Sequence, residues 1–245
     1  MKKPFVMLMM SSCLLSTPSI AQVVVNDPVA TSQAVITCGN ARFTVLTPEM
    51  IRVEYSEQAK FEDRATFTIV NRKLDAPQFT KSEDDTYLYI TTSNLKLKYR
   101  KGTDPRTLPA SPSNLTITIS GNGVSSVWYP GKSDPLNLKG TSRTLDGLMG
   151  ESKRAEMENG LVSRSGWAVI DDSWASPRSD GGRSYALSPN SDMGYPWWTQ
   201  RADNHAMDTY VLGYGHNYKK ALADYTKIAG NIPLPPNYVF VYWYS

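Results

Sequence analysis

Alternation of apolar and polar residues is the feature that most limits the fold of this chain. Apolar side chains occupy every second position in short segments at residues 51–55, 66–69, 95–99 and 115–119. Successive side chains of a strand point to opposite faces, so this spacing predicts strands with one apolar and one polar face. Such strands are typical of antiparallel sheets that are buried on one side and wet on the other.

Turn-forming residues separate these segments. They lie at Asp75-Ala76-Pro77, at residues 102–105 and at Gly121-Asn122-Gly123. Several strands at this spacing, each followed by a turn, favour a sandwich of two packed sheets. We therefore predict a mostly β fold, an antiparallel β-sandwich.

Charge and the rarer side chains exclude several classes of function. The net charge is +3, and the densest basic stretch, at residues 96–101, alternates with apolar residues as on the wet face of a strand. A nucleic-acid partner is therefore not expected, because it needs clustered Lys and Arg. His205 and His216 have no metal-ligand spacing, so we predict no metal site and no cofactor. Cys38 is interpreted as a small buried hydrophobe.

The amino terminus has the pattern of a secretory signal. Two lysines precede an apolar run at residues 5–15, and small residues follow at positions 19 and 21. This order predicts a signal peptide at residues 1–21, cleaved after Ala21, and a periplasmic or extracellular protein. The apolar run is too short to span a bilayer, so no transmembrane segment is expected. Lipid attachment at Cys13 is less favoured, because the residues before it fit a lipobox poorly.

The second half of the chain changes in character. Residues 131–208 are rich in Gly, Ser, Asp and Pro, which predicts long loops with a few short strands. Such loops either bind a ligand or decorate the scaffold, and both interpretations stay open. Apolar residues at helical spacing over 218–228 predict a helix that ends at Gly230. A proline-rich linker at 232–236 then precedes an apolar run at 238–243, which favours a strand buried on both faces.

Few side chains suggest chemistry. Asp171 and Asp172 are adjacent carboxylates, but neighbours on a strand point to opposite faces, so they cannot form a facing acid and nucleophile. One of them could bind a sugar hydroxyl, although a structural role is favoured. Trp197 and Trp198 are expected in a loop, where packing is favoured over a role as a sugar platform. No nucleophile, base and orienting group occur together, so no catalytic residue is predicted.

Several segments resemble the amino-terminal part of glycoside hydrolase family 31. The similarity covers nearly the whole chain after the signal, in order and at the expected spacing. The segments are FEDR at 61–64, VNR at 70–72, NLKGTSRTLD at 137–146, GLVSRSGWAVIDDS at 160–173, LGYGHNYKKAL at 212–222, IPLPP at 232–236 and VYWYS at 241–245.

This resemblance implies a specific organisation. It implies a β-sandwich of galactose-mutarotase-like type at residues 22–230, then a linker and the first strand of a truncated (β/α)₈ barrel at 231–245. Members of the family hydrolyse the O-glycosyl bonds of α-glycosides with retention, using two aspartates of the barrel. We therefore expect an amino-terminal fragment of an α-glucosidase or α-xylosidase that lacks the catalytic aspartates and is inactive by itself. Its expected partner is an oligosaccharide or α-glycoside.

The resemblance also suggests sugar-contact candidates. Ser165 stands where the family pattern has an acidic residue, so it would offer a neutral hydrogen bond in place of a charged one. In some members a loop of the sandwich reaches the sugar pocket. If this loop does so, Arg164, Ser165, Asp171 and Asp172 are the contact candidates.

Two other functions compete with this interpretation. The first is a secreted carbohydrate-binding sandwich without catalysis. The second is a sugar mutarotase, which would need a His/Glu acid–base pair in a groove, and the sequence gives no motif for one around His205 or His216. Nothing in the sequence sets the oligomeric state.

Overall fold

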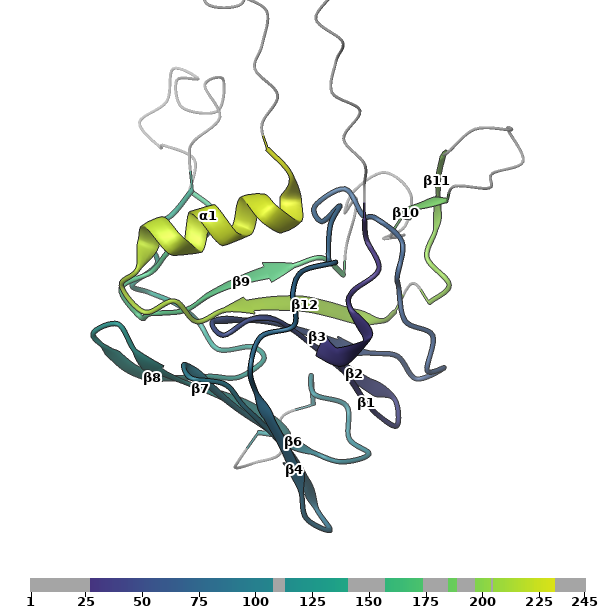
Figure 1. The fold of residues 1–245 in the computed structure, drawn as a ribbon, viewed down its shortest axis with the longest axis horizontal. Helices are drawn as coiled ribbons and strands as arrows, with labels where there is room; N and C mark the ends of the chain where they lie inside the picture. The colour runs from purple at the N-terminus through teal and green to yellow at the C-terminus, as the bar shows by residue number, and fades with distance from the viewer. Residues whose placement is uncertain are drawn as a thin grey trace, which may run out of the picture.

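The computed structural model describes residues 27–107, 113–140, 157–173, 185–188, 197–203 and 205–231. Strands dominate this part of the chain, and one α-helix follows them (Figure 1). The elements are η1 Ser32–Ala34, β1 Val35–Cys38, β2 Ala41–Thr47, β3 Met50–Tyr55, β4 Thr80–Glu83, β5 Tyr87–Thr91, β6 Leu95–Arg100, β7 Leu115–Gly121, β8 Val124–Trp128, β9 Ala168–Asp171, β10 Tyr185–Ser188, β11 Trp197–Gln200, β12 Met207–Leu212 and α1 Tyr218–Ala229.

Two antiparallel five-stranded sheets form the body of the molecule. The first sheet has the order β1-β2-β3-β12-β9, and the second has the order β4-β5-β6-β7-β8. A large apolar cluster with members from both sheets fills the space between them. Helix α1 packs on the other face of the first sheet, over a second cluster (Figure 1). The predicted antiparallel β-sandwich is therefore confirmed, with a helix as an outer layer.

The second sheet follows the alternation in the sequence. Along β6 buried and exposed residues alternate strictly, with Leu95, Leu97 and Tyr99 inside. Strands β7 and β8 are joined by Asn122 and Gly123, which both have positive φ, at 50° and 79°. Positive φ at both central positions is the requirement of the tight hairpin turn that matches strand twist, and Asn-Gly meets it with least strain. The turn predicted there is confirmed.

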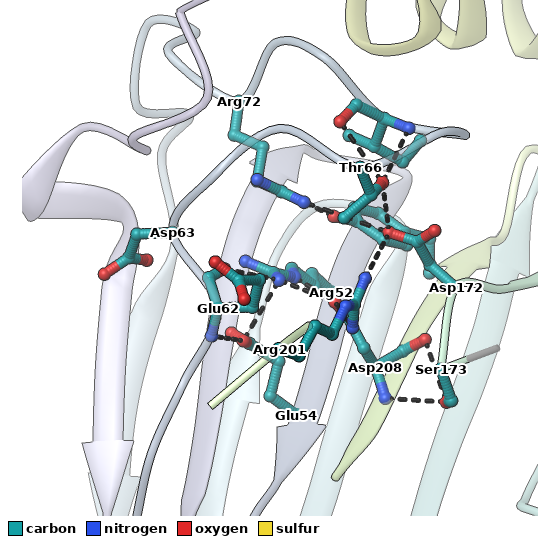
Figure 2. Close-up of polar contacts among 12 residues, drawn as sticks. Arg52, Glu54, Glu62, Asp63, Thr66, Arg72, Asp172, Ser173, Arg201 and Asp208 are labelled. Carbon is teal, nitrogen blue, oxygen red and sulfur yellow. Dashed lines mark hydrogen bonds and ion pairs between the residues drawn. The ribbon is translucent and has the colours of Figure 1, made fainter. Parts of the chain in front are cut away.

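The first sheet departs from the prediction. Strands β2, β3 and β12 are buried at every position, so residues 51–55 have no wet face. Arg52 and Glu54, which alternation alone assigns to solvent, are 1% and 2% exposed. Helix α1 covers part of this outer face, and the segment at residues 60–72 covers the rest (Figures 1 and 2).

Residues 66–69 were expected to form a strand, and that prediction is wrong. The Thr66 amide donates to the Ile69 carbonyl, and the Ile69 amide donates to the Thr66 hydroxyl, which closes a turn. Ile69 is fully buried by this turn, whereas Phe67 remains 55% exposed. The apparent alternation therefore comes from a turn that buries one side chain and presents the other.

The predicted helix is confirmed at α1. The Asn217 side chain accepts the Lys220 amide at 3.4 Å as its amino-terminal cap, and Gly230 ends the helix with a φ of 84°. Among the described residues, no helix is long and apolar enough to cross a membrane. The predicted signal peptide at 1–21 and the linker and barrel strand from residue 232 onward lie outside the described residues.

Close packing between the sheets generates a first prediction, at Gly213. A Cβ atom there would lie 2.4 Å from Leu95 Cδ2 and 2.9 Å from Ile119 Cγ1. We expect Gly213→Ala to lower the free energy of unfolding by about 1–3 kcal/mol, because the second sheet must move to admit one methyl group. Urea denaturation of the two proteins measures the difference.

Leu95→Val provides the matching control for this prediction. Shortening the side chain that the new methyl meets should make the double variant more stable than the sum of the single effects indicates. A fully additive double variant would show that Gly213 and Leu95 do not limit the sheet separation.

Candidate functional site

A cavity of about 380 Å³ opens between the sheets at one edge of the sandwich. Its walls come from β9 and β12 of the first sheet and from the end of β8, the edge strand of the second sheet. Asp171 and Thr209 lie directly opposite each other on β9 and β12 and line the cavity. This volume is at the lower end of the range for small-molecule sites.

The two predicted carboxylates lie on opposite faces of β9, as their adjacency requires. Asp171 is exposed and lines the cavity, and its Oδ1 accepts the Ser173 amide at 3.0 Å. Asp172 is 1% exposed and lies on the outer face of the sheet. Only Asp171 is therefore placed where a molecule in the cavity could reach it.

The other two candidates do not line the cavity. The Ser165 hydroxyl donates to Asp134 Oδ1 at 2.7 Å, and Ser163 donates to the same oxygen at 3.0 Å. The Arg164 side chain is exposed, and its carbonyl lies 3.2 Å from the His216 ring. Ser165 therefore reaches the cavity only indirectly, through Asp134, which does line it.

Sequence reasoning missed most of the cavity wall. Trp128 and Trp167 are buried there, and Arg106, Lys132 and Asp134 contribute charge. These residues come from separate turns and strand ends, so no local spacing connects them. The only signal was the loop-forming composition after residue 131, for which a binding role was one of two open interpretations.

Two further tryptophans lie elsewhere, and their predicted setting is wrong. Trp197 and Trp198 belong to β11, which pairs with β10, and not to a loop. Trp198 stacks on Phe67 with ring centroids 3.9 Å apart, so this tryptophan does pack against the protein. Trp197 is 48% exposed, although burial was the favoured expectation.

Asp172 belongs to a buried network of charges on the outer face of the first sheet (Figure 2). Arg52 donates to both oxygens of Asp208 at 2.7 Å. Arg201 bridges Asp208 and Asp172, at 3.0 Å and 3.2 Å. The Thr66 hydroxyl donates to Asp172 at 2.7 Å, which ties the covering segment to the sheet. We call this set of residues, with Arg42 and Glu54, the charge network.

Electrostatics in the charge network differ from one carboxylate to the next. Burial opposes the ionisation of Asp208, but the charge and hydrogen bonds of Arg52, with the charge of Arg201, lower the pKa of Asp208 to about 2. Burial raises the pKa of Asp172 and of Glu54, and the charge of Asp208 contributes to both shifts. The positive charges of the neighbouring arginines only partly offset these increases in pKa.

The charge network is unsuited to glycoside hydrolysis. Asp172 and Asp208 share Arg201 and are each 1% exposed, so no substrate can reach them. Among the described residues, no group of three or more His, Cys, Asp or Glu could hold a metal ion. Asp172 therefore has the structural role that the sequence favoured.

Comparison with known proteins gives a limited result. No protein-family model and no curated protein matches the chain. Among solved structures, it is similar to a GH31 dextranase from Flavobacterium johnsoniae in complex with isomaltotriose, at 14% identity and a TM-score of 0.43. It is also similar to a GH31 alpha-xylosidase from a soil metagenome in complex with xylose, at 12% identity and a TM-score of 0.43.

Coverage in these comparisons is unequal. The similarity spans 82% of this chain but 27% of the dextranase, and 83% of this chain but 34% of the alpha-xylosidase. The chain therefore spans about a third or less of the length of either neighbour. Similarity at this level assigns neither a family nor an activity to the chain.

The charge network generates a second prediction, at Asp208. We expect Asp208→Asn to lower the free energy of unfolding at pH 7 by about 3–5 kcal/mol, because the buried Arg52 and Arg201 would lose the carboxylate that they share. Urea denaturation measures this loss. Asp27→Asn is the matched control, since Asp27 and Lys73 form an exposed ion pair at 3.0 Å and should change stability by less than about 1 kcal/mol.

The pH dependence gives this prediction a second readout. The pKa of Asp208 is depressed to about 2 in the fold, against about 3.9 in an unfolded chain. Its stabilisation is therefore present above pH ~4 and is lost as the pH falls towards 2. The gap in stability between the wild type and Asp208→Asn should shrink over this window. A gap that stays constant down to pH 2 would contradict the assignment.

Proposed function

We propose that this chain is the amino-terminal, sandwich-containing part of an exported retaining α-glycosidase of glycoside hydrolase family 31. In the full-length enzyme it would precede a catalytic (β/α)₈ barrel that carries the two catalytic aspartates. The substrate class proposed is an α-glucoside or α-xyloside, hydrolysed at its O-glycosyl bond.

The observation that carries this proposal is that the segments resembling the family contact one another. Arg72 in the segment at 70–72 lies 3.9 Å from Asp172 in the segment at 160–173. Asn137, from a third segment, pairs with Ser163 through a β-bridge. These segments are separated by up to about a hundred residues in sequence. Each resembles the family separately, and they pack together in the fold, which supports a shared origin of the resemblance.

A fourth segment joins the same set of contacts. The Gly215 amide, in the segment at 212–222, donates to the Gly166 carbonyl at 3.0 Å. A Cβ atom on Gly215 would lie 2.8 Å from the Gly121 carbonyl oxygen, and Gly215 has a φ of 57°. Glycine therefore suits this position on two grounds, backbone conformation and space.

Chemistry supports placing catalysis outside the sandwich. Retention requires two carboxyl groups about 5–5.5 Å apart that reach both sides of one glycosidic bond. The interior carboxylates Asp172 and Asp208 are neutralised by arginines and sealed from solvent. Asp171 faces a cavity, and Asp134, the other carboxylate lining it, already accepts hydrogen bonds from Ser163, Ser165 and Asn137.

The cavity favours one alternative, a carbohydrate-binding sandwich without catalysis. Its lining combines aromatic side chains with carboxylates and hydroxyl groups, as small-molecule sites do. The test between the glycosidase proposal and this alternative is an activity assay of a longer protein from the same reading frame. Hydrolysis of an α-glycoside by that protein would favour the glycosidase, because a binding module has no catalytic activity.

The activity prediction is that the 245-residue chain hydrolyses neither aryl α-glucosides nor aryl α-xylosides. The protein translated from the reading frame extended beyond Ser245 should hydrolyse one of them and release the α-anomer first, as proton NMR of the products can measure. Replacing the barrel nucleophile of that longer protein with Asn is the control. Turnover that copurifies with the 245-residue chain would refute the placement of catalysis in a barrel.

The export prediction concerns the mature terminus. Sequencing of the exported protein should begin at Gln22, because Ala21 completes the small-residue pattern that a signal peptidase reads. Ala21→Arg should block this cleavage, since the site admits only a small side chain. An exported protein that begins at Met1 would refute export by a cleaved signal, and one that begins at a lipid-modified Cys13 would favour the anchored alternative.

A further inference from the structure

Large apolar side chains are exposed around the segment that covers the first sheet. Phe67 is exposed and stacks on Trp198 of β11. Trp197, the preceding residue of β11, is also exposed and points to the other face of the hairpin formed by β10 and β11. Val29 is exposed beside the same segment, because Arg72 donates to the carbonyl of the residue before it at 3.2 Å. We call Val29, Phe67, Trp197 and Trp198 the aromatic surface.

The aromatic surface is held in place by its neighbours. Arg64 donates to the Thr199 hydroxyl at 2.7 Å. The Leu187 amide donates to the Ala65 carbonyl at 2.8 Å. These two bonds join the β10–β11 hairpin to the covering segment, which Thr66 in turn ties to the charge network. The surface is therefore ordered before any partner binds, and this lowers the entropic cost of binding.

The end of helix α1 lies next to the aromatic surface. The amides of Val70 and Asn71 both donate to the carbonyl of Ile228, in the last turn of α1, at 2.9 Å. A Cβ atom on Gly230, which ends the helix, would lie 3.5 Å from Val70 Cγ2. Phe67 is three residues before Val70, and a segment of that length spans at most about 11 Å. The chain that follows α1 therefore starts beside the aromatic surface, and Figure 1 shows α1 and the β10–β11 hairpin on the same side of the first sheet.

The size of the aromatic surface favours a tethered partner over a separate one. A stable complex between separate proteins buries about 800 Å² on each partner, which is more than a few side chains supply. A domain on a short linker meets its docking site at an effective concentration of about a millimolar, so a few buried aromatic side chains suffice. The sequence after α1 is of this kind, since only the proline-rich stretch at 232–236 separates it from the apolar run at 238–243.

We propose that the aromatic surface is the docking site for the domain that follows α1 in the longer protein. This inference rests on the proposed function, in which that domain is the catalytic barrel. Burial of Phe67 and Trp197 against the barrel would fix its orientation relative to the sandwich. The charge network then has a second consequence, because it positions the segment that carries Phe67 as well as closing the outer face of the sheet.

Hydroxyl-radical footprinting tests the docking site without any substitution. The 245-residue chain is compared with the protein translated from the extended reading frame. We expect oxidation of Phe67 and Trp197 to be about fivefold slower, or more, in the longer protein, because docking excludes water from these side chains. Tyr87 and Tyr89, on the outer face of the second sheet, are the internal controls and should be oxidised at the same rate in both proteins.

A variant tests whether Phe67 contributes to docking. In the longer protein, Phe67→Ser should raise the oxidation rate of Trp197 towards that in the 245-residue chain, because the barrel loses an aromatic anchor. Val127→Ser, which shortens an exposed apolar side chain on the second sheet, is the matched control and should leave that rate unchanged. A thermal melt shows whether each variant is folded. If Phe67→Ser does not fold, the comparison of the two wild-type proteins decides alone.

Three results would overturn the inference. The first is equal oxidation of Phe67 in the two proteins. The second is protection of Phe67 in the 245-residue chain that grows with protein concentration, which would indicate a second copy. The third is protection by added isomaltose in both proteins, which would indicate a sugar platform. Hydrolysis is assayed separately: an active longer protein with Phe67 exposed refutes only the docking site, and a protected Phe67 without hydrolysis refutes only the proposed activity.

Discussion

Arg52 lies at the centre of the interaction on which the first sheet depends. Its guanidinium donates to both oxygens of Asp208 on the neighbouring strand, and it lies 3.1 Å from Glu54 on its own strand. Buried ions are costly unless each is paired and hydrogen-bonded. The outer face of this sheet therefore cannot be left partly covered. The segment at 60–72 must close over it, and Arg201 must join it, for the charges to be both dry and neutral.

This charge network also fixes the register of the strands. Glu54 and Asp208 are direct cross-strand neighbours, a like-charge pair that is unfavourable by itself. Arg42, opposite Glu54 on the other side, and Arg52 neutralise the pair. A slip of one residue would turn these charges towards the apolar core between the sheets. The same slip would exchange Asp171 and Asp172, which now lie in the cavity and in the charge network respectively.

The two faces of one sheet thus serve different purposes. On the outer face, the charged side chains bind one another and the segment at 60–72, and the carboxylates there are inaccessible to solvent. On the inner face, apolar side chains of both sheets form a large buried cluster, and the cavity opens at the edge where β8 and β9 lie. Because these charged side chains are paired within the protein, few charged groups remain free to bind a ligand. Asp171 differs from the carboxylates of the charge network for this reason, because it is exposed and lines the cavity.

Local sequence determined much of this protein. The alternation at 95–99 and 115–119, the Asn122-Gly123 turn and the helix ending at Gly230 all depend on near neighbours, and each was predictable. Adjacency also required Asp171 and Asp172 to face opposite ways. These features follow from backbone geometry and from the preferences of single residues, which the sequence contains directly.

Only the tertiary structure decided which polar faces are wet. Arg52 on β3 and Lys98 on β6 follow the same alternating pattern, yet Arg52 is buried and Lys98 is exposed. The difference arises because Asp208, 156 positions away in sequence, pairs with Arg52, and because the segment at 60–72 covers this face of the first sheet. The cavity likewise combines turns and strand ends that no spacing connects. Partners brought together across more than a hundred residues depend on packing of the whole chain, and local periodicity carries no information about them.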